Sequence, residues 1–212
     1  MVTPETAGSV QRSQPGYRFD FCGGHVALDF ANTVGSRSAE AREEHFNTYG
    51  DLIAWAEARE VITKADAARL RRAAAAEPDA ARTAFRRAIR LREALYQVCL
   101  RRAAGKPPPA EDLATLNRFV AETYREARLV VDGDRVVLDT GSIAAELERP
   151  FAPVVRAAVD LLTGSQAPLI GSCADEECGW LFLDTTRSRT RRWCVMKECG
   201  NRAKVRRFRG RS

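Results

Sequence analysis

The sequence predicts an α+β protein, in which a mostly helical N-terminal domain with a small β element precedes a short, basic, cysteine-rich unit. Three observations lead to this prediction. Apolar residues recur every three or four positions in several long segments, which is the period of helices packed on a core. Residues 127–140 instead hold two Val/Leu runs around an Asp-Gly pair, a typical hairpin signal. Beyond residue 165 the composition changes to arginine and cysteine.

The first half of the N-terminal domain has clear local signals. Residues 1–16 are polar with several Pro and Gly, and we expect a loose leader. Alternating aromatic and polar residues over 17–21 predict a short strand, which a glycine pair turns into a helix within 25–34. Further helices should begin near Thr48 and after Thr63, whose hydroxyl can form a capping box with Asp66.

The second half begins with the longest predicted helix, over residues 79–104, between Pro78 and the helix-ending sequence GKPPP. Another helix should follow through Leu113 and Tyr124, and the last should run from about Pro150 to Leu162. The sequence TGSQAP then marks a boundary. We therefore divide the chain into a leader at 1–16, a body at 17–164 and a C-terminal unit at 165–212.

Charge is distributed unevenly along the chain. The whole sequence carries +6, but from Thr185 onward eleven Arg or Lys face the single acid Glu198, so this tail carries +10 and the rest −4. A strongly basic tail on a mildly acidic body indicates nucleic acid as a partner. No stretch approaches the roughly 20 apolar residues of a membrane span, and the N-terminal residues lack the apolar centre of a secretion signal. We therefore expect a cytoplasmic protein with no membrane partner.

The cysteines point to a metal. Thiolates suit zinc, and four of them in a tetrahedron make a closed structural site that holds one Zn²⁺. The alternative is that these four cysteines bind no metal and are buried thiols or form an oxidised pair. A unit of about 40 residues has too little core to fold alone, so the metal should contribute on the order of 10 kcal/mol. Four of the six cysteines form two C-x4-C pairs separated by fifteen residues, Cys173 with Cys178 and Cys194 with Cys199, whereas Cys22 and Cys99 lie among apolar residues and are expected to pack in the core.

The segments around the cysteine pairs predict a treble-clef-like finger. GWLFLDTTRSRTRRW, between the pairs, has two strand-like runs around a polar turn, and GNRAKVRRFR, after the last cysteine, is typical of a helix. With Cys199 at the N-terminus of that helix, free amides and the helix dipole would favour its thiolate. Trp180 and Trp193 should form the small core of the finger, with stacking on bases as the alternative.

These motifs resemble a known family. CGNR at 199–202, RRWC at 191–194 and WLFLD at 180–184 resemble the CGNR zinc-finger family, over roughly residues 168–209. In that family the finger commonly follows an N-terminal domain called ABATE, and GGHVALDFANTV at 23–34 is similar to the opening motif of that domain. The resemblance implies a stress-linked transcription regulator whose finger binds DNA.

The basic side chains of the tail are candidate contacts to nucleic acid. Arg202, Arg206 and Arg209 would share one helix face, while Val205 and Phe208 would pack back on the finger. Phosphates would relieve the repulsion among these arginines, a few tenths of a kcal/mol per pair. A solvated tail, or one paired with the acidic body, is the alternative. The candidates are Arg187, Arg189, Arg191, Arg192, Asn201, Arg202, Lys204, Arg206, Arg207 and Arg209, although Asn201 is expected chiefly to cap or turn the chain.

The body offers one candidate ligand site. His25 and Asp29 would share a helix face with Asn32 on the next turn, which could form a small-ligand pocket or, as an enzyme, a catalytic one. A cap and hydrogen-bond network that holds the helix is the other interpretation, and the enzyme hypothesis would be dropped if these side chains proved both buried and mutually satisfied. His45 stands among charges and is expected on the surface. The common catalytic motifs are missing, so we predict no catalytic residues.

The leading hypothesis is a zinc-containing DNA-binding regulator. The finger would contact double-stranded DNA, and the body would sense a signal, such as a small-molecule effector, or associate as a homodimer. An RNA- or ribosome-associated zinc module is the first alternative, and an enzyme that uses His25 and Asp29 is the second.

Overall fold

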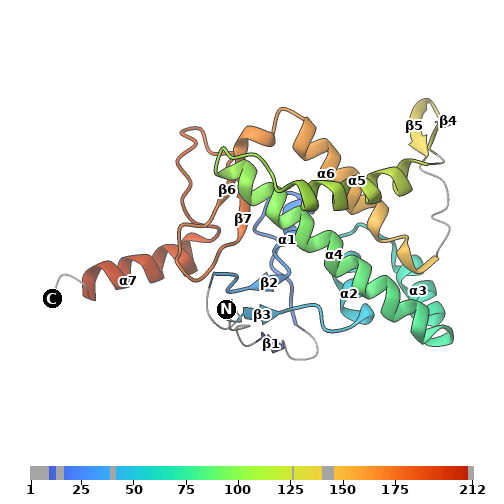
Figure 1. Cartoon of the computed structure of the whole chain (residues 1–212), viewed down its shortest axis with the longest axis horizontal. Coiled ribbons are helices and arrows are strands. Elements are labelled where there is room, and N and C mark those ends of the chain that lie inside the picture. Colours follow the sequence, from blue (N-terminus) through green and yellow to red (C-terminus); the bar gives the residue numbers. More distant parts are fainter. Residues whose placement is uncertain (1–9, 13–16, 39–41, 126, 140–145, 210–212) are drawn as a thin grey trace, which may run out of the picture.

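The computed structural model describes residues 10–12, 17–38, 42–125, 127–139 and 146–209. Its helices surround α4 (Pro78–Ala103), which contacts every other helix of the N-terminal domain (Figure 1). These helices are α1 (Val26–Ala31), α2 (Tyr49–Ala58), α3 (Lys64–Ala76), α5 (Ala110–Tyr124) and α6 (Phe151–Thr163). Among the described residues no helix is both long and apolar enough to cross a membrane.

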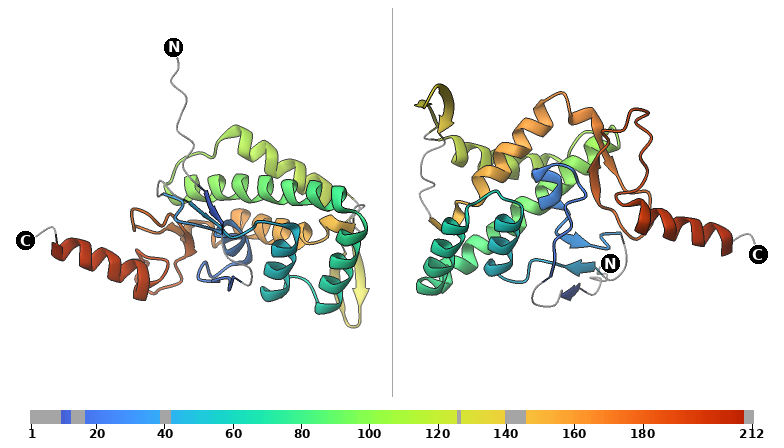
Figure 2. Two further views of the ribbon diagram at one scale, coloured as in Figure 1. Left: turned by 90° about the horizontal axis from the view of Figure 1, so that it is seen from below. Right: turned by 180° about the vertical axis from the view of Figure 1, so that it is seen from behind.

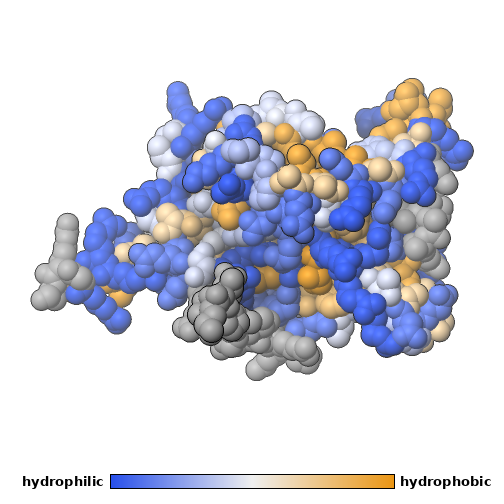
Figure 3. All heavy atoms as spheres, in the orientation of Figure 1, coloured by the Kyte–Doolittle hydropathy of each residue, from blue (hydrophilic) through white to orange (hydrophobic). Residues whose placement is uncertain are grey.

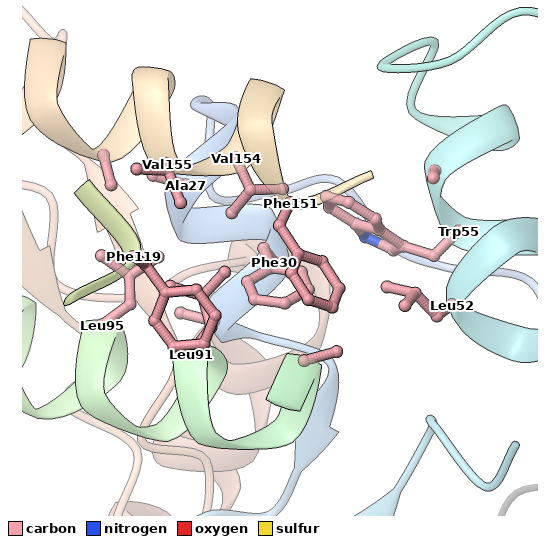
Figure 4. Packing of buried hydrophobic residues seen from close by; sticks show 14 of the residues in the cluster. Ala27, Phe30, Leu52, Trp55, Leu91, Leu95, Phe119, Phe151, Val154 and Val155 are labelled. Atoms are coloured by element: carbon pink, nitrogen blue, oxygen red, sulfur yellow. The ribbon is translucent and has the colours of Figure 1, made fainter. Parts of the chain in front are cut away.

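The core lies where α1, α2, α4 and α6 meet. Phe30 of α1 is nearly inaccessible and lies among Trp55, Leu91 and Phe151 from the three other helices (Figure 4). The ring centroids of Phe30 and Trp55 are 5.2 Å apart. Cys99 is fully buried in this core, as predicted.

Three small sheets complete the described fold. β1 (Val10–Arg12) pairs in parallel with β3 (Arg42–Glu44), which pairs antiparallel with β2 (Val34–Gly35). The predicted hairpin is confirmed as β4 (Arg128–Asp132) and β5 (Arg135–Asp139). In the C-terminal unit β6 (Ile170–Ser172) pairs antiparallel with β7 (Leu181–Leu183), and α7 (Asn201–Arg209) follows.

Local signals placed most helix ends correctly. The side chains of Thr48 and Thr63 accept hydrogen bonds from the third residue of their helices, and Thr48 forms a full capping box. Pro78 separates α3 from α4 as the first residue of the latter. The long helix, predicted over 79–104, spans 78–103.

Two predictions near the N-terminus were wrong. Residues 17–21 form no strand; Phe19 and Phe21 pack on the core instead, so their aromatic pattern reflects burial without strand pairing. Residues 10–12, expected within a loose leader, form β1, while the rest of the leader lies outside the described residues.

The molecule is elongated, with different elements at its two ends. The α7 helix projects from one end, and the β4–β5 hairpin stands at the other, in all three views (Figures 1 and 2).

Candidate metal centre and basic helix

Four cysteine side chains meet at the C-terminal unit, as the spacing predicts. The Sγ atoms of Cys173, Cys178, Cys194 and Cys199 all lie within 4.8 Å of one another, and all four residues are buried. The Sγ atom of Cys194 is 3.5 Å from those of Cys178 and Cys199. Four sulfurs at ~2.3 Å from zinc in a tetrahedron lie ~3.8 Å apart, so this cluster has the size of a zinc site. The four cysteines form one structural zinc site.

The backbone around the cluster locks the two pairs together. The Cys173 amide donates to the Trp180 carbonyl at 2.7 Å, which closes the loop that holds the first pair. The Ala174 amide donates to the Arg192 carbonyl at 2.8 Å, and the Cys194 amide donates to the Cys173 Sγ at 3.5 Å. These bonds place the second pair against the first.

The predicted hairpin between the two cysteine pairs is wrong. β7 is present, but it pairs with β6, which precedes the first pair, and residues 190–193 form no strand. Arg191 explains the difference, because its guanidinium donates to the carbonyls of Leu183, Cys22 and Cys194 and so takes up backbone acceptors that a strand partner would use. The β6–β7 hairpin therefore encloses the first cysteine pair.

The environment of Cys199 also differs from the prediction. A π-turn over Met196–Gly200 precedes α7, and the amide of Asn201 already donates to carbonyls of that turn. Burial raises the pKa of the Cys199 thiol. Arg202, which donates to the Cys199 Sγ at 3.0 Å, supplies positive charge beside this thiolate, and a metal held by the four cysteines would supply more.

Apolar side chains line the cluster. Trp180 and Trp193 pack against the four cysteines, which confirms their assignment to the small core of the finger. Cys22 packs there too, so it is a core residue of the finger and not of the helical body. Asn201 donates from Nδ2 to the Lys197 carbonyl at 2.8 Å, the turn role that was expected.

Asp175 anchors α7 to the metal site. Its side chain is fully inaccessible and accepts from Arg202 Nε at 2.9 Å and from Arg206 Nη2 at 2.6 Å. The two arginines were expected to repel each other until phosphates neutralised them; a buried carboxylate within the first cysteine loop supplies the counter-charge. Asp175 is the functional residue that sequence reasoning missed.

The outer part of α7 is exposed. Val205 and Phe208 were expected to pack back on the finger, but 49% and 77% of their surfaces remain accessible. The reason is that α7 leaves the finger after its first turns and projects from the molecule (Figure 2). Lys204, Arg207 and Arg209 are exposed on the same helix.

The loop before the second cysteine pair is ordered by Asp184. Its carboxylate accepts from the Thr186 and Arg191 amides at 3.0 and 2.9 Å. Arg191 is thereby directed inward, with its guanidinium 4.4 Å from the centre of the Phe182 ring. The other candidates of this loop, Arg187, Arg189 and Arg192, are exposed.

The finger is fastened to the body through α1. Asn32 behaves as a strand partner of β7, because its side chain donates to the Leu181 carbonyl at 2.8 Å and accepts from the Leu181 amide at 2.9 Å. The Trp180 indole donates to the Val34 carbonyl at 2.7 Å. Leu181 and Leu183 of β7 belong to the main hydrophobic core.

A second contact joins the first cysteine loop to the body. The amide of Arg37 donates to the Cys178 carbonyl at 3.0 Å, and the Tyr96 hydroxyl donates to the Gly179 carbonyl at 2.8 Å. Gly179 has φ +67°, and a Cβ there would lie 2.7 Å from the Ser38 Oγ. The positive φ and the nearby side chains of Arg37, Ser38 and Tyr96 together favour glycine at this position.

The candidate ligand site in the body is a structural network. His25 caps α1 by accepting from the Ala27 amide, and Asp29 accepts from the Gly23 amide at 2.9 Å and from Arg59 Nε at 2.8 Å. Asp29 and Asn32 are buried. His25 is only half-buried and shares no hydrogen bond with Asp29, so the burial and mutual bonding set above for dropping the enzyme hold in part.

His45 is buried, which contradicts its expected place on the surface. Only 3% of it is accessible, and its ring stacks on Tyr17 with centroids 4.0 Å apart. Burial lowers the pKa of His45 to about 4. The charged neighbours in the sequence misled the prediction, because Glu44 turns away to bind the distant Arg92.

A closed site of four buried cysteines beside a basic helix defines a zinc-finger protein with a structural metal. Residues 24–165 match the ABATE family, described as "Putative stress-induced transcription regulator", and residues 170–212 match the CGNR zinc finger. The chain belongs to the ABATE family and carries a CGNR zinc finger at its C-terminal end. No match was found among curated proteins.

Proposed function

We propose that this protein is a cytoplasmic transcription regulator whose finger and α7 bind double-stranded DNA. Residues 165–212 would then be the DNA-binding unit, and residues 17–164 the regulatory body. The observation that carries the proposal is a cationic helix that projects from the four-cysteine unit and is tied to it by Asp175 (Figure 1). A cytoplasmic location agrees with a site made of four reduced thiols.

The structure narrows the set of candidate contacts. Arg191, Arg202 and Arg206 are held by carbonyls or by Asp175, so their main role is to shape the base of the helix. Six exposed cations remain that pair with no acid among the described residues: Arg187, Arg189, Arg192, Lys204, Arg207 and Arg209. Exposed, unpaired cations on one projecting unit are suited to phosphates.

The shape of α7 favours duplex DNA over duplex RNA. A helix with its side chains is about 10–12 Å wide, which fits the ~12 Å major groove of B-DNA. The major groove of A-form RNA is too narrow for such a helix. The exposed Val205 and Phe208 would then meet base edges or thymine methyl groups, the apolar features of that groove.

The test is binding of the zinc-loaded full chain to a labelled mixed-sequence duplex and to a structured RNA at matched salt. If about five of the six cations contact phosphates, log affinity should fall against log salt with a slope of about −4 to −5. Arg207→Gln should reduce that slope by about one. Arg90→Gln removes the same charge from an exposed position of α4 and is the matched control.

Three results would count against the proposal. They are tighter binding to RNA than to DNA, a salt slope near zero, and an equal loss of affinity in Arg207→Gln and Arg90→Gln. The last result would mean that the net charge of the chain, and not α7, attracts the nucleic acid.

The body has room for an effector. A cavity of about 570 Å³ lies between α3 and α6 and is lined by Ile62, Lys64 and Arg156 among others. Its lining holds acids (Glu57, Glu60 and Asp66) as well as bases, so it suits a small polar ligand that bears both charges. Such a ligand should raise the melting temperature of the full chain and fail to do so in Arg156→Gln; equal shifts in both proteins would exclude this cavity.

A further inference from the structure

The β4–β5 hairpin is short, and among the described residues it packs on little else. Each strand has five residues, and its main contact is the other strand. Figure 2 shows the hairpin standing away from the helices. An isolated two-stranded hairpin is at best marginally stable in water, so this element is suited to further strands or another surface.

One face of the hairpin is entirely apolar. Because side chains alternate along a strand, Leu129 and Val131 share a face with their cross-strand neighbours Leu138 and Val136. The accessible fraction of these four residues ranges from 37% to 77%. Figure 3 shows them as an apolar patch at the tip of the molecule. A contiguous exposed patch of this kind marks an interaction surface.

The charges on the other face identify the partner. Arg128 begins β4 and Asp132 ends it, with three apolar residues between them. If β4 pairs antiparallel with β4 of a second copy, centred on Val130, each Arg128 lies opposite the partner's Asp132. The strand is therefore complementary to itself, as an interface with twofold symmetry requires.

The backbone N–H and C=O groups of β4 that do not bond to β5 lie at the positions that this pairing requires. Asp132 and Arg135 close a two-residue turn with Gly133 at φ +62°, and hydrogen-bonded pairs then alternate along the ladder. Leu129 and Val131 thus direct their N–H and C=O groups outward. When the pairing is centred on Val130, Leu129 of one copy lies opposite the partner's Val131. The outward N–H and C=O groups of the two copies can then bond to each other.

We propose that the β4–β5 hairpin is a homodimer interface, in which β4 pairs with β4 of a second copy to form a four-stranded sheet. β5 has a similar charge pattern, from Arg135 to Asp139, but Leu129 and Val131 are 73% and 77% accessible, against 67% and 37% for Val136 and Leu138. The more open strand is therefore β4. Since the hairpin lies at the end opposite α7, pairing leaves both basic helices accessible (Figure 1).

The first test is sedimentation velocity of the zinc-loaded full chain from about 1 to about 100 μM, the range in which small interfaces associate. The wild-type chain should show a monomer–dimer equilibrium. Val131→Pro removes an outward N–H that the hairpin itself does not use, and it should weaken association at least about tenfold. Val136→Pro removes the equivalent group from the other edge and should leave the dimer intact.

The second test exchanges charges between copies. Arg128→Asp and Asp132→Arg should each weaken the homodimer, because like charges then face each other across the twofold axis. An equimolar mixture should dimerise again, since each strand now meets its complement. Each substitution also places like charges within its own hairpin, which mixing does not relieve, so recovery can come only from contact between copies.

Several outcomes would overturn the proposal. They are a wild-type chain that stays monomeric at about 100 μM, a dimer that survives Val131→Pro, and a mixture of the two charge variants that stays monomeric. Far-UV circular dichroism and zinc content should match the wild type in every variant, which separates loss of pairing from loss of folding.

Discussion

Replacing Asp175 by asparagine tests whether a single buried carboxylate fixes the direction of α7. Asp175 accepts two charge-assisted hydrogen bonds from α7 and one from the Glu177 amide at 3.2 Å. Burial alone would raise the pKa of this carboxyl, but the bonds from Arg202 and Arg206 outweigh it and hold the pKa below its ordinary value. Asparagine keeps the shape and removes the charge.

The size of the effect follows from the exposure of the partners. A hydrogen bond to a charged group contributes about 1.5–3 kcal/mol when buried. The side chains of Arg202 and Arg206 are 50% and 38% accessible, so water can solvate them when the bonds to Asp175 are lost. We therefore assign the two bonds together a contribution near the lower end of that range. We expect Asp175→Asn to lower the free energy of unfolding by about 2 kcal/mol.

The assay combines denaturant unfolding with hydrogen exchange of the α7 amides and zinc content. Exchange in α7 should accelerate, while zinc content should stay the same because no ligand has changed. Glu177→Gln is the matched control, since this exposed acid lies 3.9 Å from Arg206 and should contribute less than about 0.5 kcal/mol. Unchanged α7 exchange in Asp175→Asn, or an equal effect of Glu177→Gln, would refute the reasoning.

Three further predictions concern the metal, the docking of the finger and pH. Cys194→Ser should abolish zinc binding and unfold residues 170–209, because ligation contributes on the order of 10 kcal/mol; protected β7 amides in that variant would contradict this. Asn32→Ala should cost about 2–3 kcal/mol and accelerate exchange of the Leu181 amide, as two buried bonds to backbone are lost; unchanged exchange would show that apolar contacts suffice. His45 has its pKa lowered to about 4 by burial, so it stays neutral in the folded state while the unfolded chain gains a proton below about pH 6.5. As pH falls from 6.5 to 4, the wild type should therefore lose up to about 3 kcal/mol of unfolding free energy relative to His45→Asn. Burial raises the pKa of Asp29 to about 6, so the wild type should instead gain unfolding free energy relative to Asp29→Asn as pH falls. If the stability differences of both variants changed with pH in the same direction, these two pKa shifts would be wrong.

Local signals predicted the elements that local physics decides. The α4 helix followed from a sustained apolar period between Pro78 and GKPPP, and the β4–β5 hairpin from an Asp-Gly turn that tolerates positive φ. The metal ligands followed from spacing alone, because two C-x4-C pairs have few other uses in a reduced protein.

The remaining features depend on partners far away in the chain. Asp175 lies 27 residues before Arg202, and Asn32 lies 149 residues before Leu181, so no local pattern could reveal either contact. The second predicted strand of the finger failed for the same reason, since the guanidinium of Arg191 donates to the carbonyl of Cys22, 169 residues earlier. Sequence periodicity also could not show that α7 leaves the finger, and hence that Phe208 is exposed.

The bond between Asn32 and Leu181 limits how far this finger is modular. β7 has a side chain of α1 on one edge, and its leucines fill the core of the body, so the finger does not carry all of its own packing. Transplanted to an unrelated host, residues 170–209 would expose apolar surface and lose the acceptor of the Trp180 indole. Retargeting a protein of this kind should therefore exchange only the outer turns of α7 and leave the metal-bearing base in its original chain.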